Sequence, residues 1–175
     1  MRISLLYLFF ITLLMVNCKS SELHTETYRN HEILVGKGKF SDLQKNPYAK
    51  WMNKNYKNYK VDSSVVNQLK RNINNFDFEV IMGTWCPDSR EQVPVFFAVL
   101  KAAGYKNSKN ISIIFVPRKY KNYAVVKKYQ LKRVPTIIVY ENGQELGRII
   151  EYPMESLEKD LLKIISGKGY KHELD

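Results

Sequence analysis

Cysteine and histidine are scarce in this 175-residue chain, which contains two cysteines, Cys18 and Cys86, and three histidines. Two cysteines exclude the disulfide framework that staples small secreted domains. The chain also lacks the four-ligand Cys/His clusters of zinc sites, so we expect no metal and no cofactor. His24, His31 and His172 lie outside the segment around Cys86, in tail-like regions. We expect these histidines to be solvated and to have no role as general bases.

Acidic side chains are also few: 17 Asp plus Glu stand against 28 Lys plus Arg, a net charge of +11. Lysines and tyrosines interleave at 55–60 and 119–123, a pattern that can stack bases and contact phosphates. These lysines are spread along segments with helical periodicity and no nucleic-acid signature accompanies them. We therefore expect no nucleic acid, and favour attraction to anionic membrane surfaces or acidic partners.

One long apolar run is present, from Ile3 to Val16 after Arg2. It is shorter than the ~20 apolar residues of a membrane-spanning helix, and polar residues 19–22 follow it at once. The pattern predicts a secretory signal peptide over residues 1–17.

The run ends at Cys18, and in this it resembles a bacterial lipoprotein signal, in which the peptidase cuts before a cysteine that carries a lipid. Asn17 departs from the small residue usual before that cysteine. The resemblance implies lipidation of Cys18 and an exported, membrane-anchored protein that faces the periplasm. Cys86 would then be the only free thiol of the mature chain, and no internal disulfide could form.

The mature chain divides into four segments. Residues 18–39 are polar apart from the island Ile33-Leu34-Val35, and we expect a tether. Helical periodicity at 40–59 and 61–73, with Ser63 as an N-cap, predicts an N-terminal extension of two or three helices over 40–75. The main domain is expected over 76–166, followed by a tail at 167–175.

Within the main domain, strands and helices alternate. Asn142-Gly143 is the strongest hairpin signal, because both central residues of a type I′ turn need positive φ. The order βαβαββα predicts an α/β fold whose mixed central sheet has helices on both faces. We expect strands at 78–82, 111–116, 136–140 and 145–150, and helices at 87–103, 123–129 and 157–165.

Cys86 lies in the sequence Trp85-Cys86-Pro87-Asp88-Ser89, where the first of these strands ends and a helix begins. The unpaired N–H groups and dipole of a helix N-terminus stabilise a thiolate. An inert buried cysteine is the alternative. Asp88 opposes the effect with a negative charge, whereas Ser89 can donate a hydrogen bond to the sulfur.

The wider pattern resembles the thioredoxin family. In that family Trp-Cys-x-x-Cys opens a helix, a proline eight residues after the first cysteine kinks it, and a cis-proline faces the thiol. Trp85, Cys86, Pro94 and Val134-Pro135 stand in those places. The resemblance implies that Cys86 is the attacking nucleophile, supported by Trp85, Pro87, Ser89 and Pro135, and that Val134 and Pro135 bind a substrate strand.

The departures from that family define the expected chemistry. Ser89 replaces the resolving cysteine, and Val80 replaces the buried aspartate that assists it. Glu151 replaces a late glycine, which leaves the backbone path at that point open. Without a resolving cysteine, a mixed disulfide on Cys86 can be released only by another thiol.

Three functions follow from this pattern. The first is monothiol disulfide reduction or isomerisation, with exported protein thiols or disulfides as partners and an external reductant. The second is a non-catalytic binding module that keeps only the groove beside the cis-proline. The third, a monothiol glutaredoxin-like protein, ranks last because the glycine pair expected after the cis-proline is absent.

Overall fold

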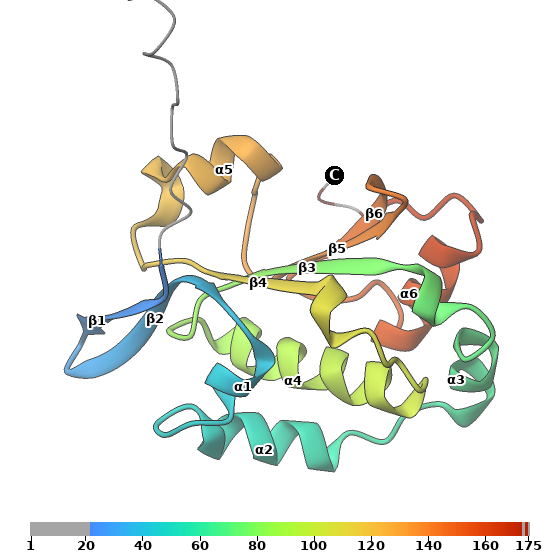
Figure 1. Ribbon diagram of the computed structural model, residues 1–175, viewed down its shortest axis with the longest axis horizontal. Coiled ribbons are helices and arrows are strands. Elements are labelled where there is room, and N and C mark those ends of the chain that lie inside the picture. Colours follow the sequence, from blue (N-terminus) through green and yellow to red (C-terminus); the bar gives the residue numbers. More distant parts are fainter. Residues whose placement is uncertain (1–21, 173, 175) are drawn as a thin grey trace, which may run out of the picture.

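The computed structural model describes residues 22–172 and 174. The predicted signal peptide and Cys18 lie outside the described residues. Six strands form one sheet in the order β1-β2-β4-β3-β5-β6 (Figure 1). The strands are β1 (His24–Tyr28), β2 (His31–Gly38), β3 (Asp77–Met82), β4 (Ile111–Phe115), β5 (Thr136–Glu141) and β6 (Gln144–Ile150).

The sheet is mixed. The central strand β3 pairs parallel with β4 and antiparallel with β5. The β5–β6 hairpin turns at Asn142 (φ 51°) and Gly143 (φ 81°), as their residue types predict.

Helices cover both faces of the sheet, which confirms the predicted α/β class. In Figure 1, α5 lies on one side of the sheet and α1, α2, α3, α4 and α6 lie on the other. Their bounds are α1 (Phe40–Leu43), α2 (Ala49–Asn58), α3 (Ser63–Leu69), α4 (Pro87–Ala102), α5 (Ala124–Tyr129) and α6 (Leu157–Ile165). Within the described part of the chain, none of the helices is both long and apolar enough to cross a membrane.

Three helices, α1, α2 and α3, form the segment before β3, within the two or three expected, but the N-cap residue of α3 differs from the one expected. Pro47, which has no N–H for a helical hydrogen bond, lies between α1 and α2. Asp62, not Ser63, caps α3: its carboxylate accepts hydrogen bonds from the backbone N–H of Ser64 at 2.9 Å and of Val65 at 3.4 Å. A carboxylate one residue earlier reaches the free N–H groups that the serine was expected to satisfy.

Most of the segment assigned to a tether is not a tether, because residues 24–38 form the hairpin β1–β2. The strand β2 pairs antiparallel with β4, and Ile33, Leu34 and Val35 are buried at 2%, 5% and 3% exposure. Arg29 and Asn30 turn the hairpin with positive φ. A solvated linker would leave these three apolar side chains in water. Pairing in the β1–β2 hairpin and with the sheet buries them, which is favourable.

The C-terminal segment also differs from the expected solvated tail. His172 is buried, and its Nε2 lies 3.0 Å from the Tyr152 carbonyl oxygen. The Tyr170 hydroxyl donates a hydrogen bond to the buried carboxylate of Asp160 at 2.9 Å. These contacts hold residues 170–172 against α6 and the loop that precedes it.

Two apolar clusters hold the layers together. The larger lies between the sheet and the helices of one side, and its fully buried members include Phe78, Phe96 and Phe115. The smaller lies toward α5 and contains Ile81, Tyr129 and Cys86. The thiol therefore belongs to the cluster that α5 and the loop before β5 enclose.

Candidate functional site

Cys86 is the N-cap residue of α4, four residues after the end of β3. Its backbone is extended (φ −84°, ψ 125°), and its carbonyl accepts the first helical hydrogen bond from the Arg90 N–H at 3.1 Å. Pro87 follows at the first helical position, where a missing N–H costs nothing and the fixed φ favours the helix. The local sequence thus places the sulfur at the positive end of α4, as predicted.

The thiol faces the loop before β5. Cys86 Sγ donates a hydrogen bond to the Val134 carbonyl oxygen at 3.3 Å and lies 3.9 Å from Asp88 Oδ2. The Val134–Pro135 peptide bond is cis, the conformation that the family resemblance implied. Only 5% of Cys86 is exposed. The structure therefore brings together Cys86, Val134 and Pro135, residues 48 positions apart in sequence.

Ser89 does not contact the sulfur. It is fully buried, and its hydroxyl accepts a hydrogen bond from the Gly83 N–H at 3.3 Å. Gly83 must be small, because an added Cβ would lie 2.5 Å from the Trp85 ring. No Ser89–Cys86 hydrogen bond is present among the described residues. Ser89 thus fixes the turn before α4, and the hydrogen bond that it could have donated to the sulfur is not formed.

Trp85 is fixed beside the thiol by three contacts. Its indole N–H donates to the Val116 carbonyl at 2.9 Å, and its ring stacks on Tyr120 with centroids 6.1 Å apart. The Arg118 guanidinium also lies over the Trp85 ring, 4.7 Å from its centroid. Burial, followed by the negative charge of Cys86, raises the pKa of Tyr120. Neither Arg118 nor Tyr120 was expected at this site, although the lysine–tyrosine pattern at 119–123 includes Tyr120 and directly follows Arg118.

The backbone path after the last strand, β6, turns at Glu151, where the related family has a glycine. Its φ of 58° is left-handed, and its N–H donates to the Pro135 carbonyl at 2.8 Å. A non-glycine residue in this conformation costs roughly 1–2 kcal/mol. The Glu151 carboxylate pairs with Arg133 at 2.7 Å, which places this ion pair beside the cis-proline loop.

Tyr152 is a further residue of this region that sequence reasoning missed. Its hydroxyl donates a hydrogen bond to Asp88 Oδ1 at 2.7 Å, although the two residues are 64 positions apart. Asp88 therefore accepts from Tyr152 through one oxygen while its other oxygen lies near Cys86 Sγ. This hydrogen bond, together with lesser contributions from burial and the Asp88 charge, raises the pKa of Tyr152 to about 12.

We expect the Tyr152 phenol to ionise well above the ordinary tyrosine pKa of ~10 because ionisation would break its hydrogen bond to a carboxylate. The Asp88→Asn variant should lower the pKa of Tyr152 toward that value. The measurement is the ultraviolet titration of tyrosinate, taken as the difference between each protein and its Tyr152→Phe counterpart. An unchanged titration in Asp88→Asn would show that the bond to Asp88 does not control this phenol.

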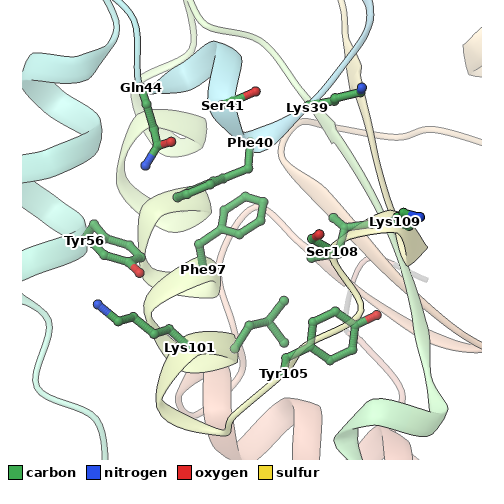
Figure 2. Close-up of a pocket in the computed structure, with 12 residues that line it drawn as sticks. Lys39, Phe40, Ser41, Gln44, Tyr56, Phe97, Lys101, Tyr105, Ser108 and Lys109 are labelled. Carbon is green, nitrogen blue, oxygen red and sulfur yellow. The ribbon is translucent and has the colours of Figure 1, made fainter.

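No group of three or more potential metal ligands occurs among the described residues. A cavity of about 560 Å³ lies elsewhere, between α1, α2, α4 and the loop before β4, and none of the residues named around Cys86 lines it (Figure 2). The chemistry of this site thus rests on one thiol, a cis-proline loop and an aromatic surface. Such a site can attack a disulfide and hold an extended substrate strand beside it.

The family model described as Thioredoxin matches residues 39–162. The chain belongs to the thioredoxin family. No curated protein matches the sequence.

Solved structures support the same fold. A protein of unknown function from Pseudomonas aeruginosa, PA1234, is 19% identical, with a TM-score of 0.51 over 69% of this chain and 82% of that one. An HIV epitope scaffold is also 19% identical, with a TM-score of 0.50 over 68% of this chain and 82% of that one. At this identity the likeness concerns the fold alone.

Proposed function

We propose that this protein performs thiol–disulfide exchange on exported proteins through Cys86 alone, while a lipid on Cys18 tethers it to the membrane. The observation that carries the proposal is the placement of the Cys86 sulfur, at the N-terminus of α4 and 3.3 Å from the carbonyl before the cis-proline. Family membership supports the reaction class. Fractionation of cells that express Cys18→Ala tests the tether, and membrane retention of that variant would contradict it.

The first step is attack on a substrate disulfide. The Cys86 thiol loses its proton to solvent, and the thiolate bonds to one substrate sulfur. The other substrate sulfur leaves as a thiolate with the electron pair of the broken S–S bond. A mixed disulfide between Cys86 and the substrate results, and one substrate thiol has been released.

Release needs a thiol from outside this chain, because the only other cysteine, Cys18, carries the proposed lipid on its sulfur. An incoming thiolate attacks the substrate sulfur, and Cys86 leaves as a thiolate. If the incoming thiol belongs to the same substrate, the result is isomerisation. If it belongs to an external reductant, the substrate is left joined to that reductant, and a second reductant thiol frees it.

Attack also requires that the thiol leave its present contact. The Cys86 S–H donates to the Val134 carbonyl, and an approaching substrate strand would pair with the same backbone. We infer that substrate docking exchanges this S–H bond for a backbone hydrogen bond and exposes the sulfur. We expect the substrate to present its disulfide in an extended segment, because such a segment can pair with the backbone of Val134, the residue before Pro135.

The exchange step is tested with a disulfide-linked dimer of a short peptide. We expect the wild-type protein to release about one peptide thiol per protein and then stall, because no resolving thiol is present. The Cys86→Ser variant, which replaces sulfur with a smaller polar atom, should release none. Release by Cys86→Ser, or repeated turnover by the wild type without added thiol, would contradict the proposal.

The burial of Cys86 favours a second candidate function, a binding module without catalysis. In that case Cys86→Ser and wild type should capture the same extended segments in reducing buffer. Alkylation of the native protein with iodoacetamide near neutral pH separates the two candidates. A Cys86 thiol that is never alkylated fits the binding module and excludes thiol–disulfide exchange.

A further inference from the structure

A cavity of about 560 Å³ lies on the side of the sheet that α1, α2 and α4 cover, and none of the residues named around Cys86 lines it. Side chains of α1, α2, α4 and the loop between α4 and β4 line it, and Figure 2 shows Phe40 beside Phe97, with the Lys101 nitrogen on the Tyr56 side. Its volume is within the range of pockets that hold small organic ligands, roughly 300–1,000 Å³. The proposed exchange reaction makes no use of it.

Aromatic rings form much of the wall. Phe40 and Phe97 lie 4.3 Å apart between ring centroids with planes tilted by 40°, and Tyr56 lies 6.0 Å from Phe40. Tyr105 completes the wall from the loop, and its hydroxyl donates to the Phe76 carbonyl at 2.9 Å. Tilted rings around a gap favour a further ring, which can contact their faces and edges.

The charge around these rings has one sign. Lys39, Lys101 and Lys109 line the cavity, and no Asp or Glu of the described residues 22–172 and 174 does so. None of the three lysines makes an ion pair within that part of the chain. Lys101 instead lies 5.5 Å from the centre of the Tyr56 ring.

Asp42, which is adjacent in sequence to the lining residue Ser41, offsets this charge only in part, through its electrostatic interaction with Lys39. One of its oxygens accepts from the Lys39 backbone N–H at 2.8 Å, and the other pairs with Lys45 Nζ at 2.8 Å. The cavity thus combines an aromatic wall with exposed, unpaired ammonium groups. A neutral or cationic ligand would use only the first of these features.

We propose that this cavity binds an aromatic monoanion, a small molecule with a ring system that fills the aromatic wall and a carboxylate that pairs with the lysines. The ring buries apolar surface against Phe40 and Phe97. The carboxylate is reached by the flexible, exposed side chains of Lys39, Lys101 or Lys109. The site is separate from the thiol and does not depend on the proposed exchange activity.

The test compares two probes of the same shape, 1-naphthaleneacetate and its neutral amide, by isothermal titration calorimetry with the full chain. We expect the carboxylate to bind with a Kd below about 1 mM and the amide to bind about fivefold more weakly. Equal affinities, or no detectable binding of the carboxylate, would overturn the proposal.

Three variants locate the binding. Replacing Lys39, Lys101 and Lys109 together by Gln should remove the preference for the carboxylate. The matched triple variant at the exposed Lys119, Lys121 and Lys127, which lie on the α5 side of the sheet, should retain it. Ser108→Trp at the rim should block both probes. Cys86→Ser should bind as the wild type does. If the matched variant loses the preference equally, or if Ser108→Trp binds normally, the probe is not in this cavity.

Discussion

Replacing Ser89 with cysteine is expected to convert Cys86 from a site that retains a mixed disulfide into one that releases it. Position 89 lies one helical turn from Cys86, so its side chain is on the same face of α4. A thiolate there attacks Cys86 in the mixed disulfide, an internal disulfide forms, and the substrate leaves as a thiol. Because the attack becomes intramolecular, release should accelerate by a factor on the order of 100 or more.

The matched control is Ser89→Ala, which also removes the acceptor of the Gly83 N–H but adds no thiol. Each variant should lose about 1 kcal/mol of stability through that hydrogen bond. Release of a peptide from the purified adduct, followed by chromatography without added thiol, measures the effect. Equal release from Ser89→Cys and Ser89→Ala would mean that position 89 cannot reach Cys86, contrary to the geometry of α4.

Removing the carboxylate of Glu158 should produce the largest loss of stability among single polar substitutions considered for this fold. Glu158 is 2% exposed and accepts two hydrogen bonds, from the Tyr59 hydroxyl at 2.7 Å and from the Asp62 N–H at 2.8 Å. These bonds join the α2–α3 connection to α6. Glu158→Ala leaves both donors without this acceptor, and we expect a loss of about 3 kcal/mol in the free energy of unfolding.

Urea unfolding followed by circular dichroism measures this loss. Glu158→Gln keeps the shape and one strong acceptor, and Tyr59→Phe removes a single donor, so each should cost about 1 kcal/mol. Burial and the bond to Glu158 raise the pKa of Tyr59 above the ordinary tyrosine value. The contribution of Tyr59 should therefore be complete below about pH 10 and decrease at higher pH. A Glu158→Ala protein as stable as Glu158→Gln would show that the helical extension is held by apolar packing alone.

The sequence predicted the part of the fold whose signals are local. The run at 78–82, the Pro-initiated helix after Cys86 and the turn at Asn142-Gly143 each carry their pattern in neighbouring residues. The β1–β2 hairpin was missed because the partner that joins it to the sheet is distant in sequence. The apolar residues 33–35 pair with β1, and residues 36–38, which follow them in β2, pair with β4 about 80 residues later. A short apolar run in a polar segment does not reveal such a partner.

The site divides in the same way. Cys86, Val134 and Pro135 were found because a family pattern fixes their positions, and the structure brings them together. Tyr152 was missed because its partner Asp88 lies in another element, and no periodicity links the two. The position of Ser89 in the sequence allowed a hydrogen bond to the sulfur but did not decide for it. In the structure its hydroxyl accepts a hydrogen bond from the Gly83 N–H instead.

The central claim is that Cys86 forms a mixed disulfide that this chain does not resolve. The most direct measurement mixes the wild-type protein with a disulfide-linked peptide dimer, quenches with an alkylating agent at increasing times and maps the adduct by mass spectrometry. The account predicts peptide attached at Cys86 that persists until an external thiol is added and then disappears. Cys86 recovered without peptide at every time, or an adduct that decays without added thiol, would contradict it.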